Sequence, residues 1–165
     1  MASDMFLLLD GIQGECEDSK HKNWIEILSW SHSFSQPTTP VRSSSGATVE
    51  KCNHSDISIT KYVDNSTDAL LSNIWNGNQI KTGKIQCLRA DAETNSPVEY
   101  LTIELEKVIL SNYSISGGGG DLPIENLSLS YGKVAYIYKD QKKDSGEGGS
   151  NKPVSHDLVT NEVGG

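Results

Sequence analysis

The alternation of apolar and polar residues predicts a chain made mainly of β-strands. Residues 26–35 place apolar or aromatic side chains on one face of a strand and serines on the other. Residues 98–110 repeat this period of two, which is typical of a half-buried strand. Shorter apolar or alternating runs predict further strands at residues 5–10, 56–63, 83–90, 127–131 and 134–138.

One stretch, residues 66–76, has the period of an α-helix instead. Its apolar residues recur four positions apart and would form one stripe along a helix. The two pairs are Leu70 with Ile74 and Leu71 with Trp75. We therefore expect a helix that packs its tryptophan on the core, with a polar residue before it and a glycine after it as caps.

Two segments have little capacity to form a core. Residues 36–52 are rich in proline, serine, threonine and glycine, and predict an extended loop that is long for a compact domain. Residues 140–165 predict a polar, glycine-rich C-terminal tail. With 165 residues, the chain is most simply one domain.

Composition and charge narrow the function classes. The formal net charge of −8 would repel the phosphates of nucleic acid and an anionic membrane surface. No apolar run is long enough for a transmembrane helix, and the first residues lack the basic region and longer apolar region of a Sec signal peptide. The three cysteines are widely spaced and form no C-x-x-C pair, which favours a reduced compartment. We therefore expect synthesis in the cytoplasm, no nucleic-acid partner and no membrane insertion.

Four consecutive glycines, Gly117 to Gly120, could form either a phosphate-binding loop or a bend between strands. A phosphate loop would continue with Lys-Ser or Lys-Thr and open a helix. Neither feature follows these glycines, because the next residues alternate as a strand does. The sequence therefore predicts a flexible connection between two strands.

Two short motifs match those of serine enzymes that recognise penicillin. Residues 58–61 read S-x-x-K, and residues 81–83 read K-T-G. Ser58 lies in an alternating strand, where residues three apart point to opposite faces, so Lys61 could not act as its base. The sequence therefore predicts no catalytic residues.

The sequence gives as little support for a metal or cofactor site as it does for catalytic residues. Cys52 and His54 are one residue apart and the other histidines are scattered, so none of the usual zinc spacings is present. We expect His32 to face the core, and His21 and His54 to lie in exposed loops. We accordingly expect no metal and no cofactor.

Several stretches, taken in order, resemble one known family. Near the N-terminus, residues 14–30 read G-E, an acidic stretch, H-K, and then W-I-E-I-L-S-W. Later stretches are "HSDISITKYVDNSTDALLSNIWNG", "VEYLTIELEKVILSNYSISGGGGDLPIENLSLSYGKVAYIY" and "HDLVTN". From about Met5 to Asn161 the chain resembles the haemolysin-coregulated protein (Hcp) family of bacterial type VI secretion. Departures from the family pattern, where serine, proline and tryptophan are usual, are Cys16, Asp140 and His156.

The resemblance implies both a fold and a function. The fold would be a compact β-barrel or two-sheet sandwich over residues 1–139, with one flanking helix at about 66–76, the extended loop 36–52 and the tail 140–165. The function would be that of a structural subunit of the type VI inner tube, not of an enzyme. Hexameric rings would stack, carry effector toxins in their lumen and be secreted by the type VI system without a Sec signal. The other partners would be a spike protein and a contractile sheath.

If the chain forms stacked rings, we expect particular roles for two loops and two strands. We expect the long loop to join stacked rings through Thr39, Pro40, Val41, Arg42, Ser43, Ser44, Ser45 and Gly46. The resemblance places the glycine bend toward the lumen, through Ser116, Gly117, Gly118, Gly119 and Gly120. We also expect the sheet segments 83–90 and 98–110 to meet between neighbouring subunits.

An alternative reading comes from a different class of protein. A small secreted β-sandwich could bind a ligand in the manner of a lectin, with Trp24, Trp30 or Trp75 stacked on a sugar. Packing of the same tryptophans in the core argues against this reading. Self-association into rings, as opposed to monomers that bind sugar, would separate the two.

Overall fold

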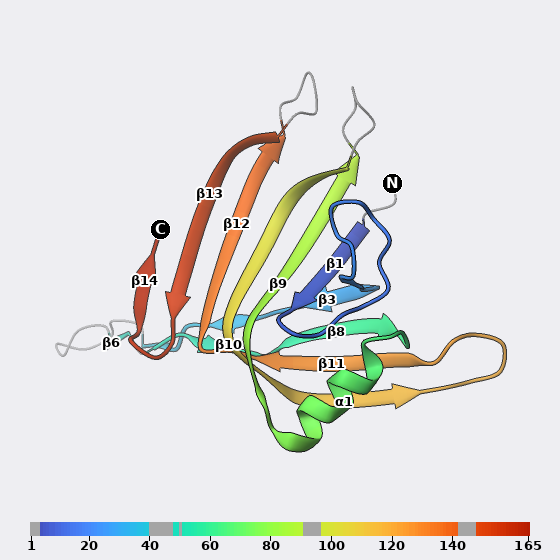
Figure 1. Ribbon diagram of the computed structural model, residues 1–165. Helices are drawn as coiled ribbons and strands as arrows, with labels where there is room; N and C mark the ends of the chain where they lie inside the picture. Colours follow the sequence, from blue (N-terminus) through green and yellow to red (C-terminus); the bar gives the residue numbers. More distant parts are fainter. Residues whose placement is uncertain (1–3, 40–47, 50, 91–96, 142–147) are drawn as a thin grey trace.

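A computed structural model describes residues 4–39, 48–49, 51–90, 97–141 and 148–165 (Figure 1). The described part of the chain is mainly β with one helix, which confirms the predicted fold class. The strands of the main sheet are β1 (Asp4–Leu9), β2 (Ile25–Glu26), β3 (Ser29–Ser31), β8 (Ile57–Tyr62), β9 (Gln79–Ala90), β10 (Pro97–Ser116), β11 (Ile124–Ser130), β12 (Lys133–Gln141), β13 (Gly148–Asp157) and β14 (Glu162–Gly164). No helix in the described part of the chain is long and apolar enough to span a membrane.

The main sheet folds into two layers that share β10. The first layer has the strand order β2, β1, β9, β10, β12, β13, β14, and the second has the order β10, β11, β8, β3. Figure 1 shows the two sets of strands crossing at a steep angle. The N-terminal part of β10 pairs with β9 and β12, and its C-terminal part pairs with β11. The two-sheet arrangement expected from the sequence is therefore present.

β10 changes its buried face at Lys107. Ile103 and Leu105 are the buried apolar residues before it, whereas Val108 and Leu110 are the buried residues after it. Lys107 has a positive φ of 56°, while the register against β9 is the same on both sides of it. The backbone conformation at Lys107 therefore accompanies the change of buried face without a change of pairing with β9. As a result, one long strand contributes core side chains to both layers.

The strand predicted at residues 26–35 is divided among β2, β3 and β4 (Phe34–Ser35). β2 pairs with β1, and the Ile27 N–H donates to the Met5 carbonyl at 3.1 Å. β3 pairs with β8 in the other layer, and the Leu28 N–H donates to the Thr60 carbonyl at 2.7 Å. The chain crosses between layers here, so among the described strands none continues from one layer to the other at this point to close a barrel, and the fold is a two-sheet sandwich.

The hydrophobic core lies between the layers and beneath the helix. Its fully buried members include Leu7, Leu9, Ile25, Ile57, Ile59, Leu70, Ile85, Ile103, Leu105, Leu127 and Leu129. Most of these positions lie in the predicted strands, whereas Leu70 belongs to the helix and Ile25 precedes the run 26–35. The period-two pattern predicted the core face at 103–105 and 127–129, but not at 26–35, where Leu28 is 42% and Phe34 49% exposed.

Helix α1 (Thr67–Asn76) lies where the sequence predicts it and packs against β10. Leu70 is fully buried, and Gly77 ends the helix with a positive φ of 64°. Trp75 is 78% exposed, so the expectation that it packs on the core is wrong. Five residues along a helix correspond to a rotation of about 140°, which turns Trp75 away from the face that Leu70 buries.

A fully buried ion pair joins the second layer to the start of the helix. Lys61 Nζ lies 2.6 Å from Glu125 Oε2 and 3.1 Å from Asp64 Oδ1. The Thr67 hydroxyl donates to Glu125 Oε1 at 2.6 Å, and the Tyr113 hydroxyl donates to the same oxygen at 2.9 Å. Burial and the Glu125 carboxylate both raise the pKa of Tyr113. The polar atoms of this pair thus have partners, as a buried charge pair requires.

The segment after residue 139 differs from the expected tail. The expected boundary falls inside β12, and β13 pairs with β12 from Lys133↔Asp157 outward. β14 pairs with β13 at the end of the sheet. Polar residues are compatible with such outer strands, because one face of each strand remains in water.

Candidate functional site: an arm and its root

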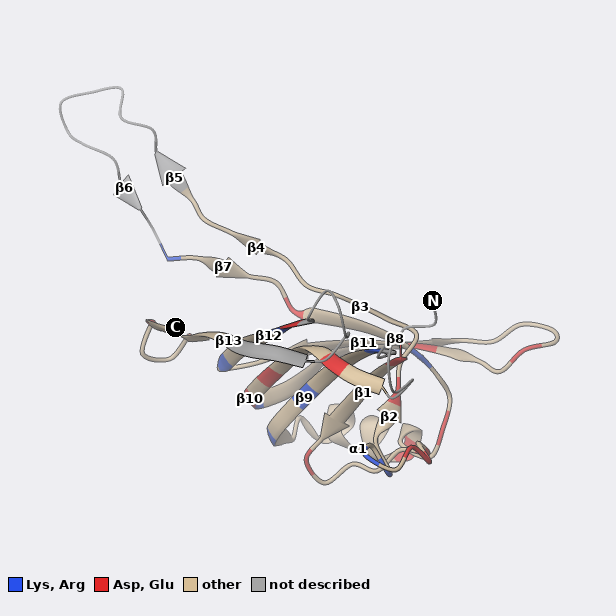
Figure 2. Cartoon of the chain, turned by 90° about the horizontal axis from the view of Figure 1, so that it is seen from above, with Lys and Arg blue, Asp and Glu red and all other residues tan. Residues whose placement is uncertain are grey.

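An arm extends away from the two-layered body (Figure 2). At its base β4 pairs with β7 (Asn53–His54), and further out β5 (Thr38–Thr39) pairs with β6 (Thr48–Val49). The described residues of the extended loop expected at residues 36–52 lie in this arm. Each ladder has two residues per strand, and two-stranded ladders have little stability of their own. The direction of the arm therefore depends on what holds its base.

Of the residues expected to join stacked rings, the structure describes Thr39 alone. Thr39 is the last residue of β5. Residues 40–46 fall outside the described residues. Their role in stacking remains a prediction.

Three histidines and two tyrosines are linked by hydrogen bonds at the base of the arm. This root cluster consists of His32, His54, Tyr131, Tyr136 and His156. His54 Nδ1 lies 2.7 Å from the Tyr131 hydroxyl, and His54 Nε2 lies 2.8 Å from His156 Nδ1. His32 Nδ1 lies 2.5 Å from the Tyr136 hydroxyl, and its Nε2 lies 2.7 Å from the Tyr131 hydroxyl. The cluster therefore connects the arm to β12 and β13.

The root cluster is partly shielded from water. The Phe34 ring makes edge contacts with the rings of His32 and His54, with centroids 4.2 and 4.9 Å away. Burial is the largest cause that lowers the pKa of both histidines. Burial also raises the pKa of Tyr136 to about 12. His54 is half-buried in β7, so its expected place in an exposed loop is wrong.

The glycine connection lies between β10 and β11, at the end of the second layer opposite the arm (Figures 1 and 2). Ser116 ends β10, and all four glycines after it are exposed. A Cβ atom added at Gly118 or Gly119 would meet no atom within 4 Å, whereas Gly120 has a positive φ of 106°. The bend predicted from the sequence is present, and glycine is conformationally required only at its last position.

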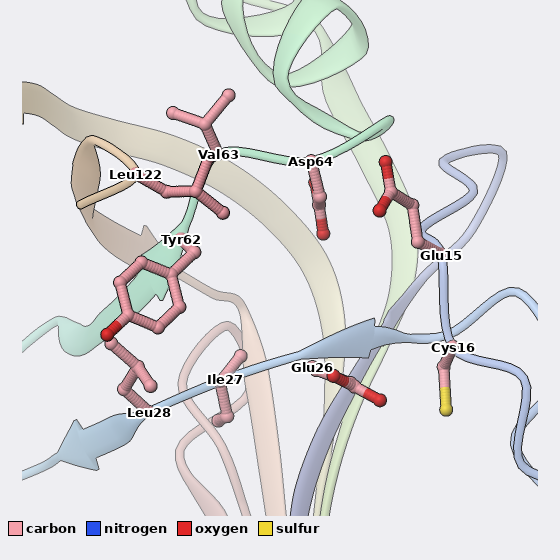
Figure 3. A pocket seen from close by; sticks show the side chains of 9 residues that line it. All are labelled: Glu15, Cys16, Glu26, Ile27, Leu28, Tyr62, Val63, Asp64 and Leu122. Atoms are coloured by element: carbon pink, nitrogen blue, oxygen red, sulfur yellow. The ribbon is translucent and has the colours of Figure 1, made fainter. Parts of the chain in front are cut away.

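A cavity of about 320 Å³ lies beside the chain crossing at residues 27–28 (Figure 3). Carboxylates of Glu15, Glu26 and Asp64 line it together with apolar side chains that include Tyr62 and Leu122. No lysine or arginine is among its lining residues. Sequence reasoning missed this cavity, because four separate segments form it.

Comparison with known proteins decides the family. Residues 6–138 match the family described as "Type VI secretion system effector, Hcp". Protein hcp1 from Pseudomonas aeruginosa is 35% identical over 157 residues, which cover 94% of each chain. The chain belongs to the Hcp family.

Solved structures of Hcp proteins share the whole fold. Hcp1 from Salmonella typhimurium is 28% identical, with a TM-score of 0.79 over 99% of both chains. A type VI secretion system effector from Yersinia pestis is also 28% identical, with a TM-score of 0.73 over 93% of this chain and 99% of that one. Hcp proteins are structural, secreted proteins, and this chain is a subunit of the type VI secretion tube.

The S-x-x-K motif of this Hcp chain, at residues 58–61, lies within strand β8. Ser58 is exposed and Lys61 is fully buried, because they occupy opposite faces of β8. In the described part of the chain, no group of three or more histidine, cysteine, aspartate or glutamate side chains could hold a metal ion. Burial raises the pKa of the Cys16 and Cys87 thiols, which keeps them protonated and unreactive.

His21 is buried, so the expectation that it lies in an exposed loop is wrong. Its Nδ1 contacts Asp18 Oδ2 and its Nε2 contacts Gln86 Oε1, each at 2.6 Å. The Gln86 amide nitrogen donates to Glu99 at 2.7 Å, which fixes the amide oxygen toward His21. Both ring nitrogens of His21 therefore face acceptor oxygens. The same hydrogen bond from His21 lowers the pKa of Asp18.

Sequence reasoning also missed the root cluster. Alternation could place Tyr131 and Tyr136 on strands, but His54 and His156 are 102 residues apart. No local pattern brings such residues together. The sequence did hold one signal for such a cluster, because aromatic and histidine residues are frequent in the strands on either side of the long loop.

Proposed function

We propose that this Hcp chain forms hexameric rings that stack into a tube, with the arm as the element that joins one ring to the next. The observation that carries this proposal is the arm itself. It extends beyond the body in two short ladders, and a segment of this length without core residues is unusual unless it has a partner or another function. The role is structural, with no catalytic step.

Ring formation requires two different surfaces that fit each other on neighbouring subunits. β9 pairs with β10 and, over residues 83–88, also with β1, and β10 pairs on both sides over residues 101–106, so the central parts of these two strands offer no free edge. The contacts expected at 83–90 and 98–110 would therefore have to use side chains, not backbone pairing. Among the described strands, β14 pairs only with β13 and β3 only with β8. These outer strands supply the unpaired backbone groups that favour association.

If the chain forms a tube, its other binding partners can be proposed as well. The spike protein and contractile sheath of type VI secretion would contact assembled rings, and effector toxins would lie in the lumen beside Ser116 to Gly120. The chain would leave the cytoplasm through the type VI system without a Sec signal. No nucleic acid takes part, in keeping with the net charge of −8.

One observation favours the alternative of a ligand-binding module, namely the exposed Trp75. Exposed tryptophans are frequent at sites of recognition. Trp24 and Trp30, however, are partly buried and pack against two different hydrophobic clusters. The three side chains therefore form no common stacking platform, and the tube subunit is the better reading.

The proposal is tested by the mass and symmetry of the purified particle. Light scattering at micromolar concentration should give six chain masses, and electron microscopy should show a sixfold ring with a central opening. Measurements at several salt concentrations guard against loss of a charge-dependent contact. Monomers, or closed pairs without an opening, under all conditions would contradict the proposal.

A further inference from the structure

The proton positions in the root cluster can be derived from its two ends. The Ser55 carbonyl can only accept, and it lies 3.1 Å from His32 Nε2, so this nitrogen carries the hydrogen. In a neutral ring, His32 Nδ1 then accepts from the Tyr136 hydroxyl. With His32 Nε2 also directed at Tyr131, the Tyr131 oxygen acts as an acceptor on that side.

The opposite end leads to the same assignment. His156 Nε2 lies 3.0 Å from Asn161 Oδ1 and donates to it, so a neutral His156 accepts at Nδ1. His54 Nε2 must then donate to His156, and His54 Nδ1 accepts from the Tyr131 hydroxyl. Tyr131 thus accepts from His32 and donates to His54. The two halves agree only when all three imidazoles are neutral and carry their hydrogen on Nε2.

Protonation of the histidines disrupts this arrangement of hydrogen-bond donors and acceptors. A proton on His156 directs its Nδ1–H at His54 Nε2, which can accept only if His54 moves its own hydrogen to Nδ1. Tyr131 then faces two donors and its hydroxyl hydrogen loses its acceptor. A second proton, on His54, would place two N–H groups and two positive charges across a contact of 2.8 Å. The cluster therefore tolerates one proton poorly and two not at all.

We propose that the root cluster is a proton-controlled latch, which holds the base of the arm against β12 and β13 while its histidines are neutral and releases it when they are protonated. His54 is the central group, because it lies on β7 of the arm and contacts both Tyr131 and His156. The latch acts within a single chain. Its test is therefore separate from the test of ring formation.

The surroundings of the latch determine the direction of its pH response. The titratable groups around His54 are Cys52, Asp56, His32, Tyr131, Tyr136 and His156. Burial lowers the pKa of His54 most, and the charge of His156 lowers it further. Burial also dominates at His32, where Asp56 opposes the shift. The Asp56 carboxylate itself accepts a hydrogen bond from the Ser111 hydroxyl at 2.5 Å.

The sign of the effect follows from these lowered pKa values. Below the ordinary histidine pKa of 6.5, a released or unfolded histidine takes up a proton that the latched histidine does not. The stabilisation is therefore complete above about pH 6.5 and is lost progressively as the pH falls below that value. An open groove of about 530 Å³ passes over His54 and His156, which gives water access to the cluster.

Two variants separate the closed and open states of the latch. Glutamine at position 54 offers one acceptor and one donor, as neutral histidine does, but takes up no proton, so His54→Gln should remain closed at low pH. Tyr131→Phe keeps the ring and removes the central hydroxyl, so it should be open at every pH. His21→Gln is the control, because it removes a histidine that belongs to a different hydrogen-bond network.

Hydrogen exchange of backbone amides in residues 52–55 reports on the latch, because the two-residue ladder of β4 and β7 is too short to persist alone. After correction for intrinsic rates, wild-type protection should fall about fivefold or more between pH 7.5 and pH 5.5. His54→Gln should change less than about twofold over the same range, and Tyr131→Phe should be weakly protected at both pH values. His21→Gln should follow the wild type, and core amides of β9 and β10 should stay protected.

Nitrogen NMR of the imidazoles provides a second readout. At pH 7.5 the hydrogens of His32, His54 and His156 should all be on Nε2. Unchanged wild-type protection at pH 5.5, an equal loss in His54→Gln, or wild-type behaviour of Tyr131→Phe would each overturn the proposal. A Nδ1 hydrogen on His54 at pH 7.5 would do so as well.

Discussion

At the scale of single residues, the buried Lys61–Glu125 pair shows how context changes the meaning of a side chain. Lys61 shares the inner face of β8 with Ile57 and Ile59, both of which are core residues. In the sequence it could be taken for the base of a serine enzyme. In the fold its ammonium group has carboxylate and carbonyl partners, and the exposed Ser58 lies on the other face. Its role is to hold β8, β11 and the start of α1 together.

Removing one partner of this pair should destabilise the fold strongly. Lys61→Met leaves the Glu125 carboxylate buried without its cation, which should cost about 3–5 kcal/mol of unfolding free energy. The double variant Lys61→Met with Glu125→Gln should lose less, because the buried charge disappears and the glutamine oxygen still accepts from Thr67 and Tyr113. Chemical denaturation at one fixed protein concentration measures both.

The matched control is the Lys84–Glu104 pair on the outer face of the sheet. Its atoms are 3.7 Å apart and both side chains are more than a third exposed. Lys84→Ala should therefore change the unfolding free energy by less than about 1 kcal/mol. Equal effects of Lys61→Met and Lys84→Ala would show that the buried pair adds nothing specific.

At the scale of elements, local patterns predicted the strands and the helix, and long-range pairing decided the rest. The helix needed only its own spacing and the glycine at its end, so α1 begins one residue from the expected position although Ser66 makes no side-chain capping hydrogen bond. The serine-rich stretch 26–35 looked like one strand, but its backbone serves β1, β8 and β7 in turn. The C-terminal strands were missed because polar residues suffice at the outer end of a sheet. The root cluster was missed because its histidines meet only through these pairings.

The arm is the element whose removal should affect assembly most selectively. Deletion of residues 39–48 removes the outer part of the arm and leaves the β4–β7 ladder and the root cluster in place. The core residues all lie outside the deletion, so folding and rings should persist. Tubes should no longer form in electron micrographs, and secretion of the chain should fail.

Shortening of the glycine connection is the control for this deletion. Removal of Gly118 and Gly119 alters an exposed bend of similar polarity at the opposite end of the second layer. Tubes should still form in that variant. If the arm deletion left tube formation and secretion unchanged, the arm would be a surface loop without a role in stacking.

At the scale of the whole molecule, the positions of the two protruding segments are compatible with the separate roles proposed for them. The arm and the glycine connection leave opposite ends of the second layer, so a contact made by one does not obstruct the other (Figure 2). The body between them is held by the two-layered core and by β10, which belongs to both layers. This arrangement suits a subunit that must join copies of itself and still present a second surface to cargo.

The cargo surface can be tested without disturbing the subunit. Gly119 has no positive φ, and a side chain there meets no atom within 4 Å, so Gly119→Trp should fold with nearly wild-type stability. If Ser116 to Gly120 line the lumen, six tryptophans would narrow it while the ring persists. An effector that depends on the ring for its stability should then be degraded faster in cells that contain the variant. Gly119→Ala, which adds a single methyl group, should protect the effector as the wild type does. Equal protection by Gly119→Trp would place these residues away from the lumen, because a bulky ring in the path of the cargo could not be neutral.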